Sequence, residues 1–270
     1  MFSLKTIISY YWPHIIKYKK SFFSTFVFYG ASMVIAGSIT PLYYKKIIDV
    51  ISLGDAVQNK ETLLMSLFVK LALFILAYNV FFRTADFFMV FCQTRILRDL
   101  RNYAFDKITE HSYVFFSNNF SGSLVAKIKR FVGSFETIHD TTVFHFWMVA
   151  VKLLSIIVVL FWTIPILGLV FSVWCVAYIA MTMFFVKKKI KYDFKESEED
   201  SRVTARFSDV ISNILNIKLF TSQKNEYESF MEISERERLA QSKAWRLGNI
   251  IFASQGFLLM TLEIAGMYFA

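Results

Sequence analysis

The sequence predicts an all-α integral membrane protein. Hydrophobic residues make up 56% of the 270 residues, above the roughly 45–50% that is typical of soluble domains. They gather in blocks of about 20 residues, the length that crosses a ~30 Å hydrocarbon layer as a helix. Only nine Gly and three Pro are available, too few for the many turns between the short strands of a transmembrane barrel.

Five segments meet this length and composition, and we expect each to cross the membrane once. The predicted spans are residues 22–42, 63–91, 143–164, 166–186 and 248–270. The third and fourth spans are separated by Pro165, which lacks a backbone N–H and disfavours helix at the preceding residue. We therefore expect a tight hairpin there and not one continuous helix.

The basic residues predict the orientation, because Lys and Arg are enriched in short cytoplasmic loops beside the spans. They are frequent before the first span and in the loops at residues 92–142 and 187–247, and absent from the Pro165 hairpin. We expect a multi-pass protein of the cell membrane with its N-terminus and both long loops in the cytoplasm. The net charge of +9 follows from these loops, and no nucleic-acid-binding module accompanies it.

Residues 1–20 precede the first span and carry aromatic side chains beside cations, such as Trp12 and Tyr18 beside Lys17. Aromatic and basic residues favour the headgroup level of a bilayer. We interpret this segment as an interfacial elbow helix bent at Pro13, with a disordered tail as the alternative. Residues 21–270 then form one transmembrane domain.

Both long loops carry helical periodicity that continues the neighbouring spans. In the first loop, residues 96–112 read as an amphipathic extension of span two, and residues 124–140 lead into span three. In the second loop, residues 187–206 extend span four and residues 222–246 lead into span five. Each loop is predicted to be a long helical hairpin with a short element at its tip.

The tips carry a family resemblance. Residues 115–127, with a paired aromatic, turn residues, Gly, an aliphatic pair and Lys, resemble the first intracellular loop of ABC exporter transmembrane domains. Residues 209–230 resemble the second such loop, and Pro41 with Ile47-Ile48-Asp49 is similar to the end of the family's first helix. The sequence departs from the family pattern, which commonly has Asp, Gly and Glu, at Phe131, Asn213 and Gln223.

The resemblance implies a function for the tips. They would be coupling helices that pass the movement of nucleotide-binding domains to the translocation path. The residues concerned are Ser117, Asn118, Asn119, Phe120 and Gly122 in the first loop, and Asp209, Asn213, Ile214 and Ile217 in the second. Without the resemblance, both segments would be read as ordinary solvated turns.

The resemblance also implies partners that this sequence does not supply. An exporter half has six spans followed by a nucleotide-binding domain, so we expect the chain to be an N-terminal fragment with five of the six. No Gly is followed by Lys, so the phosphate-binding loop is absent and the chain has no ATPase site of its own. ATP and Mg²⁺ would bind in the missing or partner domain, and a second transmembrane half would complete a homodimer or heterodimer.

Two charges inside the predicted spans are candidates for the substrate path: Lys152 in span three and Glu263 in span five. A charge at mid-bilayer is costly unless it faces protein or water. A direct pair between them would require the lysine stem to reach along the bilayer normal. Arg83 and Asp86 are spaced as an interfacial helix pair. No His has partners at metal-ligand spacing, and no catalytic motif is present.

Two other classes of function remain open. A secondary transporter or channel would show broken spans or repeated halves near mid-membrane. A membrane scaffold or sensor would carry a soluble output domain. Neither feature is evident, so the sequence favours the membrane part of an ATP-driven exporter whose cargo is not readable.

Overall fold

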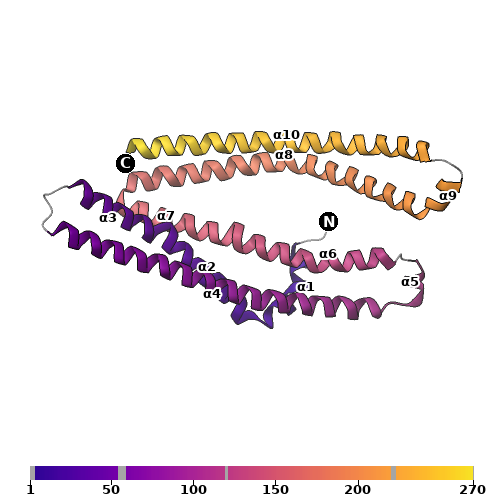
Figure 1. The fold of residues 1–270 in the computed structure, drawn as a ribbon, viewed down its shortest axis with the longest axis horizontal. Coiled ribbons are helices and arrows are strands. Elements are labelled where there is room, and N and C mark those ends of the chain that lie inside the picture. The colour runs from indigo at the N-terminus through magenta and orange to yellow at the C-terminus, as the bar shows by residue number, and fades with distance from the viewer. Residues whose placement is uncertain (1–3, 54–58, 119–120, 220–222, 270) are drawn as a thin grey trace. The chain divides into compact units, whose positions relative to one another are not determined.

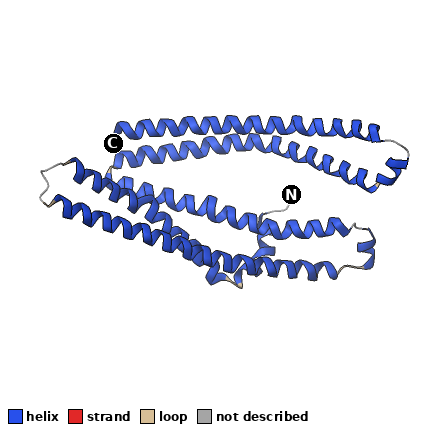
Figure 2. Cartoon of the chain, in the orientation of Figure 1, coloured by secondary structure: helices blue, strands red, loops and turns tan. Residues whose placement is uncertain are grey.

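The computed structural model describes residues 4–53, 59–118, 121–219 and 223–269, and every element in these ranges is a helix (Figure 2). The predicted all-α class is therefore confirmed. In the part of the chain that the structure describes, five helical stretches are long and apolar enough to cross a membrane: Lys19–Ser52, Lys60–Thr109, Leu124–Thr163, Pro165–Ser212 and Gln223–Met267. Each overlaps one of the five predicted spans.

The chain divides into two compact units, Met1–Leu160 and Phe161–Ala270. The first unit contains α1 (Leu4–Ile16), α2 (Lys19–Val34), η1 (Ile35–Ile39), α3 (Thr40–Ser52), α4 (Lys60–Thr109), α5 (Tyr113–Asn118), α6 (Ser121–Asp140), η3 (Thr141–Trp147) and most of α7 (Met148–Thr163). The second unit contains α8 (Pro165–Ser212), α9 (Ile214–Leu219) and α10 (Gln223–Phe269). Figure 1 labels the α-helices of both units.

The long helices continue well beyond the apolar spans, as the periodicity predicts. The 48 residues of α8 correspond to about 72 Å at ~1.5 Å per residue. The hydrocarbon layer takes up only ~30 Å of this length. About 40 Å of α8 therefore lies outside the hydrocarbon, and the same reasoning holds for the 50 residues of α4.

The predicted hairpin at Pro165 is present. Ile164 has φ −142° and ψ 88°, which breaks the helix, and Pro165 opens α8, where its missing N–H costs nothing. The chain returns so tightly that a Cβ atom on Gly168 would lie 2.9 Å from the backbone nitrogen of Phe161. A glycine is required at this close approach.

Within the described residues, two π-helical segments interrupt the long helices, and no local sequence pattern predicts them. One of them, η1, lies between α2 and α3, directly before Pro41. A proline ring clashes with the carbonyl four residues earlier, here that of Gly37, and the wider π turn relieves this contact. The other, η3, joins α6 to α7 without a comparable breaker.

The short helix α1 packs against α4 and α6. Tyr11 is buried with Ile96, Leu100 and Phe135, and its hydroxyl donates a hydrogen bond of 2.8 Å to the carbonyl of Phe131. Pro13 lies inside α1, which ends at Ile16, and a turn at residues 17–18 separates α1 from α2.

In the second unit, α8 and α10 run side by side (Figure 1). Near the ends furthest from α9, the indole of Trp174 donates to the carbonyl of Leu258 at 2.9 Å. Further along, Ala240 and Ala244 are buried, and such small side chains allow two helices to approach closely. The pair is therefore held together both in the span and in its extension.

Candidate functional site

The second tip, which we define as residues 206–226, begins where α8 ends at Ser212. Asn213 interrupts the helix with φ −105° and ψ 14°. Its backbone N–H and its side-chain Nδ2 both donate to the carbonyl of Asp209 at 3.0 Å. Its own carbonyl accepts from the N–H of Ile217 at 3.1 Å, so that α9 starts in a new direction. The residue that departs from the family pattern thus supplies the break.

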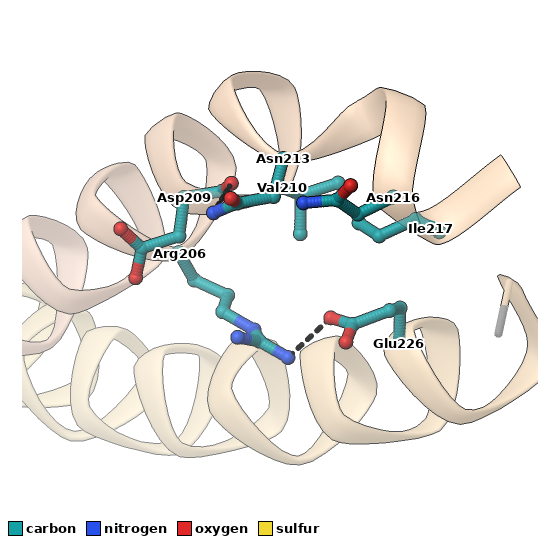
Figure 3. Close-up of a pocket in the computed structure, with 7 residues that line it drawn as sticks. All are labelled: Arg206, Asp209, Val210, Asn213, Asn216, Ile217 and Glu226. Atoms are coloured by element: carbon teal, nitrogen blue, oxygen red, sulfur yellow. Dashed lines mark hydrogen bonds and ion pairs between the residues drawn. The ribbon is translucent and has the colours of Figure 1, made fainter. Parts of the chain in front are cut away.

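A polar hollow of about 350 Å³ lies beneath this break, between α8, α9 and the start of α10 (Figure 3). An ion pair between Arg206 of α8 and Glu226 of α10 crosses it, and both side chains are about one quarter exposed. Arg206 Nη2 also donates to Ser229 at 3.3 Å. The hollow is lined by Arg206, Asp209, Val210, Asn213, Asn216, Ile217 and Glu226.

The outer side of the second tip is apolar. Ile211, Leu215 and Leu219 are 68%, 74% and 77% exposed, and Ile214 is 39% exposed. Contiguous exposed apolar side chains outside the membrane mark an interaction surface. The four predicted residues thus divide into two groups: Asp209, Asn213 and Ile217 line the hollow, and Ile214 belongs to the exposed surface.

The first tip, which we define as residues 110–122, has the same construction. A short helix, α5, joins α4 to α6, and Tyr113, Val114 and Phe116 expose 85%, 64% and 41% of their surface. The ring of Phe115 lies 4.2 Å from that of His111, whose Nδ1 is 2.9 Å from the carbonyl of Lys107. The tip therefore also presents aromatic and aliphatic surface on a short helix.

The structure places this helix earlier than the predicted segment at residues 117–122. Ser117 is exposed near the end of α5, and Gly122 is exposed in the first turn of α6. Asn118 ends α5, and its side chain lies outside the described set. Asn119 and Phe120 lie outside the described residues. The helical character begins at Tyr113 because Ser112, whose carbonyl accepts from the N–H of Phe115 at 3.0 Å, starts the turn.

Sequence reasoning missed the Arg206–Glu226 pair. The available signal was a pair of opposite charges, one on each side of a predicted tip. An antiparallel hairpin brings such residues together only at one particular register. That register depends on where the helix breaks, and the break at Asn213 was not predicted.

Charged side chains within the spans occupy different environments. Lys152 lies on α7 in the first unit, and Glu263 lies on α10 in the second. Arg83 and Asp86 form the expected pair at 2.8 Å. Asp86 also accepts a hydrogen bond of 2.6 Å from the hydroxyl of Tyr29 on α2, a contact that helical spacing could not reveal.

A charged cluster fixes the end of α1 to the extension of α4 beyond the apolar span. Asp99 accepts hydrogen bonds from Arg98 at 2.8 Å and from Tyr18 at 3.1 Å, and Lys17 lies 3.6 Å away. Burial opposes ionisation of Asp99, but these partners outweigh it and lower the pKa of the carboxyl. Within the described residues, no three His, Cys, Asp or Glu side chains are grouped as metal ligands.

Comparisons with known proteins agree with this architecture. The family model of the ABC transporter transmembrane region matches residues 21–270. A solved structure described as a bacterial Atm1-family ABC exporter with ATP bound is 18% identical and superposes with a TM-score of 0.73. The match covers 94% of this chain and 44% of that exporter, so the chain spans less than half of its length. The long spanning helices, their extensions and the family match together establish that this chain belongs to the ABC transporter transmembrane region family.

Proposed function

We propose that this chain forms the transmembrane half of an ATP-driven exporter and that its two tips are coupling helices. The two tips would face the cytoplasm, where each would contact a nucleotide-binding domain. A second transmembrane half would complete the path for the cargo. ATP and Mg²⁺ would be bound by the nucleotide-binding domains, because this sequence contains no phosphate-binding loop.

The observation that carries the proposal is the pair of long helical hairpins, each ending in a short helix with exposed apolar side chains. A tip can move a span only if the connection between them is stiff. In the second unit, α8 and α10 contact one another at widely separated points. In the span, Trp174 donates a hydrogen bond to the carbonyl of Leu258, and near the tip the rings of Phe207 and Phe230 are 4.6 Å apart. A push on the tip would therefore move both helices together.

The composition of the tips supports contact with protein and not with water alone. Leu215 and Leu219 expose about three quarters of their surface. Both lie on α9, which follows the end of α8 that is far from the apolar span. When a partner protein covers exposed aliphatic side chains outside the hydrocarbon layer, burial of their surface contributes roughly 25 cal/mol per Å² to the binding free energy. The polar groups of the hollow beside them would orient the partner through hydrogen bonds.

The test is the Ile214→Asp variant of the complete protein, assayed for cargo transport and for cargo-stimulated ATP hydrolysis. A carboxylate in the proposed interface would be left without water or a partner, at a cost of about 1–3 kcal/mol or more. We expect transport and the stimulated part of ATP hydrolysis to fall at least about tenfold. Basal ATP hydrolysis should persist.

Leu239→Asp is the matched control, because Leu239 is 45% exposed, close to the 39% of Ile214, and lies on α10 away from the tip. This variant should retain transport within about twofold. Unchanged transport and stimulated ATP hydrolysis in Ile214→Asp would refute the assignment of the second tip. Phe120→Asp provides the equivalent test of the first tip.

A further inference from the structure

The stretch of α8 that directly follows the fourth predicted span is rich in lysine. Five of its first nine residues are lysines: Lys187, Lys188, Lys189, Lys191 and Lys195. Lys189 forms an ion pair with Asp193. The other four, which we call the basic face, are exposed and make no ion pair with the described residues of their own unit.

The basic face occupies one side of α8. At about 100° per residue, its four lysines fall within an arc of about 100° around the helix. Lys187 and Lys191 are four residues apart and Lys188 and Lys191 three, spacings at which like charges repel and destabilise a helix. The nearest acidic residue on this side, Glu198, is paired with Arg202 at 2.7 Å. The basic face therefore lacks a counter-charge within its unit, and an external anion would relieve the repulsion.

The position along α8 places the basic face at the membrane surface. Residues 166–186 rise about 31 Å as a helix, which matches the ~30 Å hydrocarbon layer, and the headgroup layer adds roughly 5–8 Å on each side. Lys187, Lys188 and Lys191 lie within about 8 Å of the end of the span along the helix. They are therefore level with the headgroups. Lys195 lies about 13 Å beyond the span, and its stem can extend back toward the bilayer.

Aromatic side chains mark the same level on both helices of the unit. A Cβ atom at Gly248 of α10 would lie 3.5 Å from the Cε of Lys189, so the start of the fifth span is level with the lysines. Trp245, just before it, is 63% exposed, and tryptophan favours the headgroup level. On α8, the ring of Phe184 lies 4.4 Å from the Nζ of Lys188. Apolar surface and cations thus adjoin one another, as they do where hydrocarbon meets headgroups.

We propose that the basic face binds the headgroups of anionic phospholipids in the adjacent leaflet. Clusters of roughly four to eight Lys and Arg beside a transmembrane helix are typical of such recognition, and each cation contributes about fivefold, the factor that corresponds to ~1 kcal/mol. The phosphate groups would pair with Lys187, Lys188 and Lys191. The inference is independent of the exporter function, because it requires only that α8 crosses a bilayer.

The apolar surface beside the basic face favours a lipid over an acidic segment of a partner protein. Val176 and Phe184 precede the lysines on the same side of α8 and are 68% and 55% exposed. They lie within the fourth predicted span, where acyl chains can cover them. A phospholipid joins an anionic group to acyl chains and therefore meets both surfaces at once. An acidic protein segment outside the membrane would meet only the charges.

The test is photolabelling of the complete protein in nanodiscs of neutral phosphatidylcholine. The two probes are phosphatidylglycerol and phosphatidylcholine that carry the same diazirine near the glycerol backbone, so that they differ only in the headgroup. We expect the anionic probe to label peptides from residues 176–195 at least about tenfold more than the neutral probe, since two or more cations act together. The triple variant Lys187→Gln/Lys188→Gln/Lys191→Gln should lower this ratio at least about fivefold.

Two triple variants serve as controls. Replacement of the same three lysines by Arg should preserve the ratio, because it keeps the charges. Lys127→Gln/Lys129→Gln/Arg130→Gln removes three exposed cations from α6 and should leave the ratio unchanged. These residues lie about 20 Å or more along the helix from the third predicted span, well beyond the ~8 Å over which charges act in physiological salt.

Three results would overturn the proposal. The first is equal labelling by the two probes, and the second is a preference for phosphatidylglycerol that the α8 triple variant does not change. The third is protection of these peptides from both probes, which would show that protein covers the basic face. Because the assay measures neither transport nor ATP hydrolysis, its outcome is separate from that of the coupling variants.

Discussion

The ion pair between Arg206 and Glu226 should hold the second tip closed, and Glu226→Gln removes its charge with little change of volume. Arg206 would keep the bond to Ser229, but its carboxylate partner in the hollow would be lost. Hydrogen bonds to charged groups contribute about 1.5–3 kcal/mol when buried and pairs at the surface about 0–1. With both side chains about one quarter exposed, we expect a loss of about 1–1.5 kcal/mol in the local opening free energy.

Hydrogen exchange read by mass spectrometry measures this loss directly, because 1.4 kcal/mol of local stability corresponds to tenfold faster exchange. Amides of α9 and the first turns of α10 should exchange about five- to tenfold faster in Glu226→Gln. Arg206→Gln should act similarly, and the double variant should be less affected than the sum of the two. Exchange within twofold of the parent protein, or strictly additive effects, would show that the pair does not hold the tip.

Three further variants test the packing of helices within each of the two units. Ala244→Leu puts a large side chain in place of the small, fully buried one of Ala244 on α10. Thermal unfolding should show that the free energy of unfolding falls by about 1–3 kcal/mol. Tyr29→Phe removes the bond to Asp86 and should cost about 0.5–1.5 kcal/mol in the same assay, with the fold unchanged. Asp99→Asn should release α1, which limited proteolysis after Ile16 would detect. Since the pKa of Asp99 is lowered by folding, its contribution is present above about pH 4 and is lost as the pH falls. Acidification of the parent protein should therefore reproduce the Asp99→Asn cleavage pattern, while the variant itself shows no further change.

The long helices could be predicted because their signals are local. Apolar blocks identify the spans, and helical periodicity continues them into the loops. A proline between two adjacent spans, here Pro165, marks a hairpin. The same kind of signal gives the approximate location of both tips. These features depend on residues that are close in the sequence.

The remaining features depend on contacts between distant residues. The hydroxyl of Tyr29 reaches Asp86 only once α2 and α4 are packed together. The approach of Lys152 to Gly37 likewise requires α7 to lie against η1. Even the start of α5 differs from the prediction, since the sequence offers turn residues at several adjacent positions. Helix boundaries at the tips are set by which of these residues closes the turn.

Crosslinking from the tips tests the central claim most directly. A photoreactive amino acid at Leu215, which is 74% exposed, would report what covers the second tip in the complete, membrane-embedded protein. The same group at Leu239 provides the comparison site. If the tips are coupling helices, Leu215 will crosslink to a nucleotide-binding domain and Leu239 will do so far less. Crosslinks to lipid alone, or equal crosslinking from both sites, would contradict the account.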